Sequence, residues 1–143
     1  MTNILLMLNL LPERESIKIS PTGNSMRPFI SGYRDDVFLI KPSFPLKRND
    51  IALYQRESGQ YVLHRIHHSK VINGETLYFF LGDSQTTLEG PIHECCIHAI
   101  ATQILRKGRI IKCNNLLYRF ISQVWLILQP LRPMILKLYD HFH

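Results

Sequence analysis

The hydrophobic and polar positions between residues 17 and 113 form short apolar runs of the kind that make β-strands. Turn residues separate these runs, and Asn73-Gly74 is a strong signal for a hairpin turn. We therefore expect a mainly β domain over residues 17–113, with a compact sheet or barrel-like fold. The predicted strands cover residues 17–20, 35–41, 50–55, 60–69, 75–82 and 96–113, the last divided by a turn at Lys107-Gly108.

The pattern after Cys113 has the helical period instead. Arg119, Ser122 and Gln123 share one face of the first segment, and its other positions are almost all apolar. Pro130 ends this helix and a second short one starts near Pro133, which predicts an amphipathic helical hairpin over residues 114–143. Two interpretations remain open for the hairpin. It lies on an anionic membrane surface, or it covers the open face of the sheet.

Residues 1–16 form an apolar segment without a basic start or a small-residue cleavage site, so they do not resemble a signal peptide. The run is also shorter than the roughly 20 residues that a membrane-spanning helix needs, so we expect no transmembrane anchor here. We expect a short helix or strand that packs on the domain or dips into a membrane surface.

Composition limits which kinds of partner and cofactor we expect. A chain of 143 residues fits one domain, and a net charge of +6 favours an anionic partner. The three cysteines make a poor disulfide framework. The spacing of the residues that could bind a metal matches no standard zinc site, so we expect neither a metal nor a cofactor. These residues are His64, His67, His68, Cys95, Cys96 and His98.

The stretch SPTGNSMRPFI, residues 20–30, contains the candidate nucleophile Ser25. Gly23 allows an unusual backbone angle and Pro28 stiffens the exit, so the loop can expose the serine hydroxyl. Met26 suits a hydrophobic substrate cleft or a core contact equally. A serine hydroxyl needs a base within hydrogen-bond reach, and histidine titrates near working pH.

Four short motifs, in order, resemble the signal peptidase I and LexA-type superfamily of serine peptidases. GNSMRP resembles the serine motif, LKRNDIALYQ a strand-opening motif, YVLHRIHH the motif with the general base, and FLGDSQ the terminal Gly-Asp motif. The resemblance covers roughly residues 18–112. It implies a compact signal-peptidase/LexA-like β fold with Ser25 as the nucleophile.

The base motif has His64 where many members of this superfamily have lysine, which resembles the histidine-base, endoplasmic-reticulum type of signal peptidase. Histidine needs little tuning of its pKa to serve as a base, and Lys70 is a poor alternative six residues on. The resemblance also implies that Asp83 orients His64. The alternative is a turn aspartate bonded to its own backbone.

The resemblance implies a serine endopeptidase that cleaves a signal or leader peptide bound in an extended conformation, with Gly23, Met26 and Pro28 beside the substrate. The alternative is a non-catalytic module of the same fold that binds a peptide or a partner. LexA-type relatives bind DNA through a separate helix-turn-helix domain, and the first 16 residues are too few for one, so we expect no nucleic acid. We expect the protein to associate peripherally with a membrane. The side of the membrane stays open, and the cytoplasmic side is one of the two alternatives.

Overall fold

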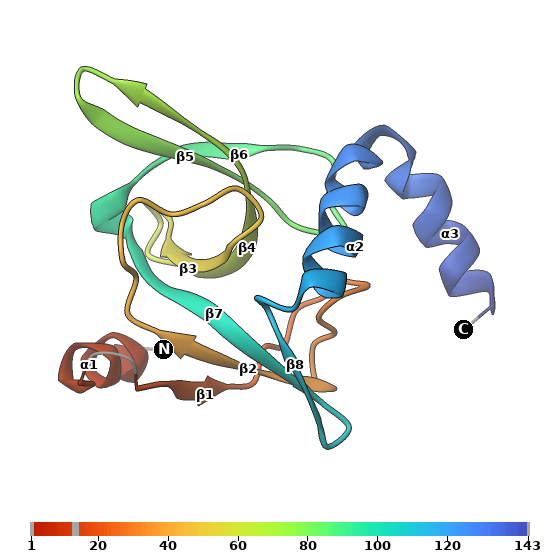
Figure 1. Cartoon of the computed structure of the whole chain (residues 1–143), viewed down its shortest axis with the longest axis horizontal. Coiled ribbons are helices and arrows are strands. Elements are labelled where there is room, and N and C mark those ends of the chain that lie inside the picture. Colours follow the sequence, from red (N-terminus) through yellow and green to blue (C-terminus); the bar gives the residue numbers. More distant parts are fainter. Residues whose placement is uncertain (1, 13–14, 143) are drawn as a thin grey trace.

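The structure is a computed structural model that describes residues 2–12 and 15–142. Its strands form one antiparallel 8-stranded sheet in the order β1-β2-β7-β3-β4-β5-β6, with β8 paired to β7 outside this path (Figure 1). The mainly β prediction is confirmed. The strands are β1 (Ile17–Ile19), β2 (Asp35–Ile40), β3 (Ile51–Gln55), β4 (Tyr61–Ile72), β5 (Glu75–Leu81), β6 (Glu89–His93), β7 (Ile97–Arg106) and β8 (Arg109–Lys112).

Both predicted hairpin turns are present. Asn73 and Gly74 have φ angles of 53° and 76°, and Lys107 and Gly108 have 50° and 79°. Two consecutive positive φ angles match the right-handed twist of the flanking strands, which is why such turns favour glycine at the second position. The β4–β5 and β7–β8 hairpins project from opposite ends of the sheet (Figure 1).

Strand β6 is the strand that the sequence pattern does not predict. It contains Gly90-Pro91, a pair whose local preference is for a turn. Because β6 is an edge strand of the sheet, proline's missing N–H leaves no interior bond unmade. Glu89 of this strand pairs with Phe80 of β5.

The core has two clusters on the two sides of the bent sheet. The first contains Val37, Leu39 and Leu53, and the second contains Ile66 and Phe80. Helix α1 (Thr2–Leu10) adds Leu8, which is only 2% exposed, to the first cluster. Of the alternatives expected for this segment, the structure therefore shows a short helix whose Leu8 packs on the domain. Among the described residues, no helix is long and apolar enough to cross a membrane.

The C-terminal segment forms helix α2 (Leu116–Ile127), the short 3-10 helix η2 (Gln129–Leu131) and helix α3 (Arg132–Phe142). The side chain of Asn115 caps α2 by accepting a hydrogen bond from the Tyr118 N–H at 3.1 Å. Figure 1 places α2 against the sheet and α3 farther out. The helical hairpin is thus present, and α2 contributes the buried Trp125 and Leu126 to the domain. A further 3-10 turn, η1 (Glu94–Cys96), precedes β7.

Candidate active site

Ser25 lies in a tight loop between β1 and β2. Backbone bonds close the loop, from the Arg27 N–H to the Asn24 carbonyl at 3.2 Å and from the Ile30 N–H to the Met26 carbonyl at 2.9 Å. Met26 and Ile30 are buried in the first core cluster, at 4% and 1% exposed. The apolar neighbours thus anchor the loop while Ser25 stays half-buried beside a cleft.

His64 of β4 contacts this serine directly. Its Nε2 lies 3.1 Å from Ser25 Oγ, which is hydrogen-bonding distance across 39 residues of sequence. The prediction that Ser25 and His64 meet is confirmed. Val62 and Ile66 are buried on the same side of the strand, so His64 has a largely dry environment.

The environment of His64 keeps it neutral. The side chain is only 2% exposed, and this burial lowers the pKa of His64 from 6.5 to about 4. At neutral pH the imidazole therefore has a free lone pair with which to accept a proton. A histidine of this kind is a weaker base than a free imidazole, but it is fully in the base form.

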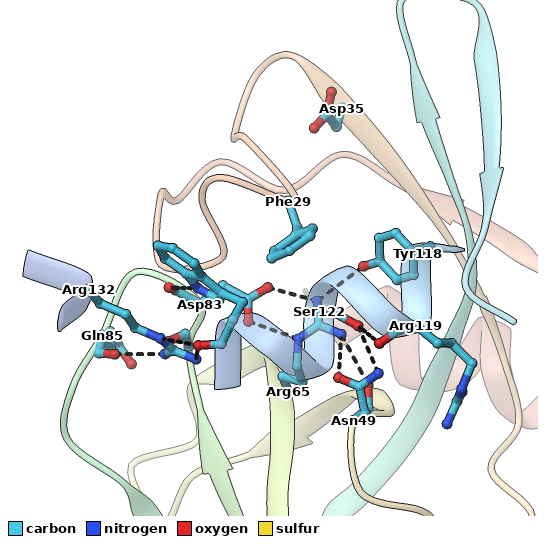
Figure 2. Close-up of polar contacts among 12 residues, drawn as sticks. Phe29, Asp35, Asn49, Arg65, Asp83, Gln85, Tyr118, Arg119, Ser122 and Arg132 are labelled. Carbon is cyan, nitrogen blue, oxygen red and sulfur yellow. Dashed lines mark hydrogen bonds and ion pairs between the residues drawn. The ribbon is translucent and has the colours of Figure 1, made fainter. Parts of the chain in front are cut away.

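Asp83 does not orient His64, so this expectation is wrong. Its carboxylate instead accepts two hydrogen bonds from Arg65, Nε to Oδ1 and Nη2 to Oδ2, both at 2.8 Å (Figure 2). Arg65 follows His64 along β4, so its side chain points to the opposite face. Both members of the pair are fully buried. The turn-aspartate alternative is not observed either.

The imidazole has a different partner at its other nitrogen. Tyr54 of β3 places its hydroxyl 3.2 Å from His64 Nδ1. The register pairs Ala52 with His64 and Tyr54 with Val62, which brings the tyrosine diagonally next to the histidine. Sequence reasoning missed Tyr54. The pairing of the two neighbouring predicted strands was the signal that could have found it.

Arg65 is the centre of a buried polar cluster beneath the site. Its guanidinium also binds the Asn49 carbonyl at 3.1 Å and the Tyr118 hydroxyl at 3.1 Å, and it lies 5.2 Å from the centre of the Phe29 ring (Figure 2). Asn49 has a φ of 82°, a left-handed backbone position that asparagine tolerates. Because Phe29 belongs to the serine loop and Tyr118 to α2, this cluster joins both segments to β4.

The segment that contains Asp83 holds the serine loop in place. The Ser84 N–H donates to the Ser25 carbonyl at 2.9 Å, and the Ser84 hydroxyl donates to the Asn24 carbonyl at 3.0 Å. A Cβ on Gly82 would lie 2.7 Å from the Ser25 carbonyl oxygen, so glycine permits this close approach. Asp83 therefore supports Ser25 through the backbone rather than through His64.

Arg132 at the start of α3 fastens the same segment from the other side. Its guanidinium is fully buried and donates to the Gly82 carbonyl at 3.0 Å and the Gln85 carbonyl at 2.9 Å (Figure 2). It also donates to the carbonyl of Trp125 in α2. The helical hairpin is thereby tied to the segment that positions Ser25.

A cleft of about 390 Å³ opens at the Ser25–His64 pair, within the usual size range for ligand sites. Gly23 and Met26 line it, as expected of substrate-binding residues, but Pro28 does not. Gly23 does not have a positive φ, and a Cβ there would meet nothing within 4 Å, so the unusual backbone angle expected at this position is absent. The other apolar lining comes from Ile19, Ile30, Leu53, Tyr61, Val62 and Leu63.

The cleft exposes a length of strand with one open side. Residues 61–64 of β4 pair with β3, whereas the pairing of β4 with β5 begins only at Arg65. Within the described sheet, residues 61–64 thus have a strand partner on one side only. An extended peptide in the cleft can add to this edge by backbone hydrogen bonds.

The remaining candidate residues lie away from Ser25. Lys70 is exposed on β4 with its ammonium 5.3 Å from the centre of the Phe79 ring, and His68 stacks on the same ring at 4.5 Å. His67 and His68 are both half-buried. Across residues 2–12 and 15–142, no group of three or more His, Cys, Asp or Glu side chains could hold a metal ion.

Comparisons with known proteins give no relative. No protein-family model matches the chain, and neither the curated proteins nor the solved structures contain a significant match.

Proposed function

We propose that this chain is a serine endopeptidase of the signal peptidase and LexA-type superfamily, with the histidine-base branch as its nearest type. The observation that carries this proposal is the 3.1 Å contact between Ser25 Oγ and His64 Nε2 at the base of the cleft. A serine with a neutral imidazole in reach is the minimum unit for acyl transfer. The four sequence motifs support the same activity.

The reaction follows from this geometry. Ser25 Oγ forms a bond to the scissile carbonyl carbon while its proton passes to His64 Nε2. The carbon–nitrogen bond then breaks, and the proton passes from Nε2 to the leaving amine. Water next attacks the acyl ester, gives a proton to His64, and the proton returns to Ser25 Oγ as the acid product leaves.

The substrate is a signal or leader peptide that binds in an extended conformation. The open edge at residues 61–64 supplies backbone partners on the side of the cleft next to His64. The lining is mostly apolar, which favours apolar side chains before the cleaved bond.

The test is turnover of a panel of synthetic leader peptides, with the products identified by mass spectrometry. We expect cleavage by the wild type and a loss of at least a thousandfold in Ser25→Ala and in His64→Ala. Ser69→Ala and His93→Ala are matched controls, because both residues are exposed and lie outside the cleft. Equal turnover by all five proteins would exclude Ser25 and His64 as the catalytic pair.

We also propose that the helical hairpin docks on an anionic membrane surface. Helix α2 turns two polar residues inward: Ser122 accepts from the Asn49 amide at 2.8 Å, and Arg119 lies 3.7 Å from Asp50, whereas Gln123 is exposed. Its apolar face points to solvent, with exposed Leu116, Leu117, Phe120, Ile121, Val124 and Ile127. Between Glu94 and Asp140 the chain has no Asp or Glu, and the exposed Lys107, Arg109, Lys112 and Lys137 supply positive charge. Apolar exposure with this positive charge matches anionic lipid.

A further inference from the structure

The His64 imidazole is linked through Tyr54 to a carboxylate that the motif resemblance does not assign. Tyr54 is fully buried, and its hydroxyl lies 3.2 Å from His64 Nδ1. A hydroxyl can donate only one proton, so the direction of this bond decides which nitrogen of His64 is free to face Ser25. If Tyr54 donates to Nδ1, the proton sits on Nε2 and the histidine cannot accept from Ser25.

Glu89 of β6 favours one of these two directions. It pairs in register with Phe80, and the Phe80 ring packs on Tyr54 with centroids 4.2 Å apart. The register and this ring contact place Glu89 near Tyr54, and after burial the negative charge of Glu89 is the largest cause that raises the pKa of the phenol. A carboxylate only accepts, so a tyrosine that turns its O–H toward Glu89 keeps an oxygen lone pair for His64.

Arg56 fixes the carboxylate in this position. Its Nε and Nη2 donate to the two oxygens of Glu89 at 2.8 and 2.7 Å. Arg56 follows Tyr54 by two residues, and its hydrogen bonds to Glu89 lower the pKa of that carboxyl, which stays ionised. Burial also raises the pKa of Tyr54, so the phenol keeps its proton.

We propose that Tyr54 and Glu89 are positioning residues for His64, arranged as Ser25–His64–Tyr54–Glu89. His64 Nδ1–H donates to the Tyr54 oxygen, and the Tyr54 hydroxyl donates to Glu89. His64 Nε2 is left as the acceptor for the Ser25 proton. When His64 becomes an imidazolium, the negative charge of Glu89 stabilises it through the tyrosine, and no proton leaves Nδ1. This inference rests on the proposed peptidase activity.

The first test measures the histidine without any substrate. Nitrogen NMR of the full chain at neutral pH reports which ring nitrogen of His64 carries the proton. We expect the Nδ1–H form in the wild type and a mixed population in Tyr54→Phe. Tyr78→Phe is the matched control, because Tyr78 is also buried and its hydroxyl instead accepts from the Leu46 N–H at 3.0 Å. A wild type in the Nε2–H form overturns the proposal.

The second test measures the serine with a fluorophosphonate probe, which labels activated serines irrespective of the natural substrate. We expect the rate of Ser25 labelling to fall roughly ten- to a hundredfold in Tyr54→Phe and about threefold or more in Glu89→Gln, relative to Tyr78→Phe. Both variants remove a group that stabilises the imidazolium. Labelling slows at acid pH as His64 becomes protonated. The pH at which this decrease occurs, the acid limb of the labelling rate, should therefore be lower in each variant.

The outcomes separate the two proposals. If the wild type is not labelled at Ser25, the peptidase proposal fails, and the tautomer measurement still decides the role of Tyr54. If labelling depends on Ser25 and His64 but is the same in Tyr54→Phe and Tyr78→Phe, only the positioning role fails. If Tyr54→Phe does not fold, Glu89→Gln at the half-buried Glu89 decides the question by the rate and the acid limb.

Discussion

Arg65 and Asp83 form a fully buried bidentate ion pair directly beneath the serine loop, with both N–O distances at 2.8 Å. Their attraction offsets the cost of removing two charges from water only while both partners are present. The pair holds the segment whose backbone bonds fix Ser25. It therefore links the stability of the domain to the geometry of the site.

Breaking this pair should destabilise the protein strongly. Asp83→Asn keeps the side-chain volume but leaves Arg65 without a carboxylate, which should lower the free energy of unfolding by roughly 3 kcal/mol in urea denaturation. Asp140→Asn is the control, because its ion pair with Arg27 is exposed and should contribute about 1 kcal/mol or less. An Asp83→Asn protein of normal stability that had lost Ser25 reactivity would contradict the structural role.

Adding a methyl group at Gly82 should impair Ser25 without abolishing the fold. The new Cβ of Gly82→Ala would lie 2.7 Å from the Ser25 carbonyl, so the serine loop must shift. We expect the rate of fluorophosphonate labelling to fall at least tenfold, since small displacements of a reacting group cost large factors. Ser69→Ala is the control, because Ser69 is exposed on β4 and lies outside the cleft. Equal labelling of the two variants would show that the close contact is unimportant.

Protonation of His64 should destabilise the fold in acid. The unfolded chain binds a proton at this residue below about pH 6.5, whereas the buried histidine has a pKa of about 4. The unfolded state thus binds more protons between these values, and stability falls as the pH drops from 6.5 to 4. The free energy of unfolding should fall by up to roughly 3 kcal/mol because of His64.

His64→Gln supplies the comparison for this pH effect, because other titrating groups are the same in both proteins. Urea unfolding at pH 7 and pH 4 should show a smaller acid loss in His64→Gln than in the wild type. Identical pH dependence in the two proteins would refute the depressed pKa.

The exposed face of α2 should bind anionic vesicles. We expect co-sedimentation with phosphatidylserine-containing liposomes at low salt, weaker binding at high salt, and little binding to neutral liposomes. Phe120→Glu should reduce binding roughly tenfold. Val71→Glu is the control, because Val71 is also exposed, at 71%, but lies on β4. Concentration-dependent dimers that Phe120→Glu abolishes, without vesicle binding, would instead identify the face as a contact between two copies.

The sequence alone determined most of the strands and the meeting of Ser25 with His64. Alternating polarity specifies a strand through local side-chain direction, and the Asn73-Gly74 and Lys107-Gly108 turns depend on local backbone preferences. The order of the motifs paired the serine with the histidine, and their 3.1 Å contact agrees. The edge strand β6 was not predicted, because Gly90-Pro91 reads locally as a turn.

Only the tertiary structure decided the partners of these groups. Asp83 follows β5, which pairs with β4 at Arg65, so it meets the arginine on one face and cannot reach His64 on the other. Helical periodicity predicts that Arg119 and Ser122 lie on one side of α2. It does not predict whether that side faces the core or the solvent. That side faces inward because Asn49 and Arg65 are buried and find hydrogen-bond partners on α2. Unpaired polar groups in the interior would cost more free energy than apolar side chains left in water.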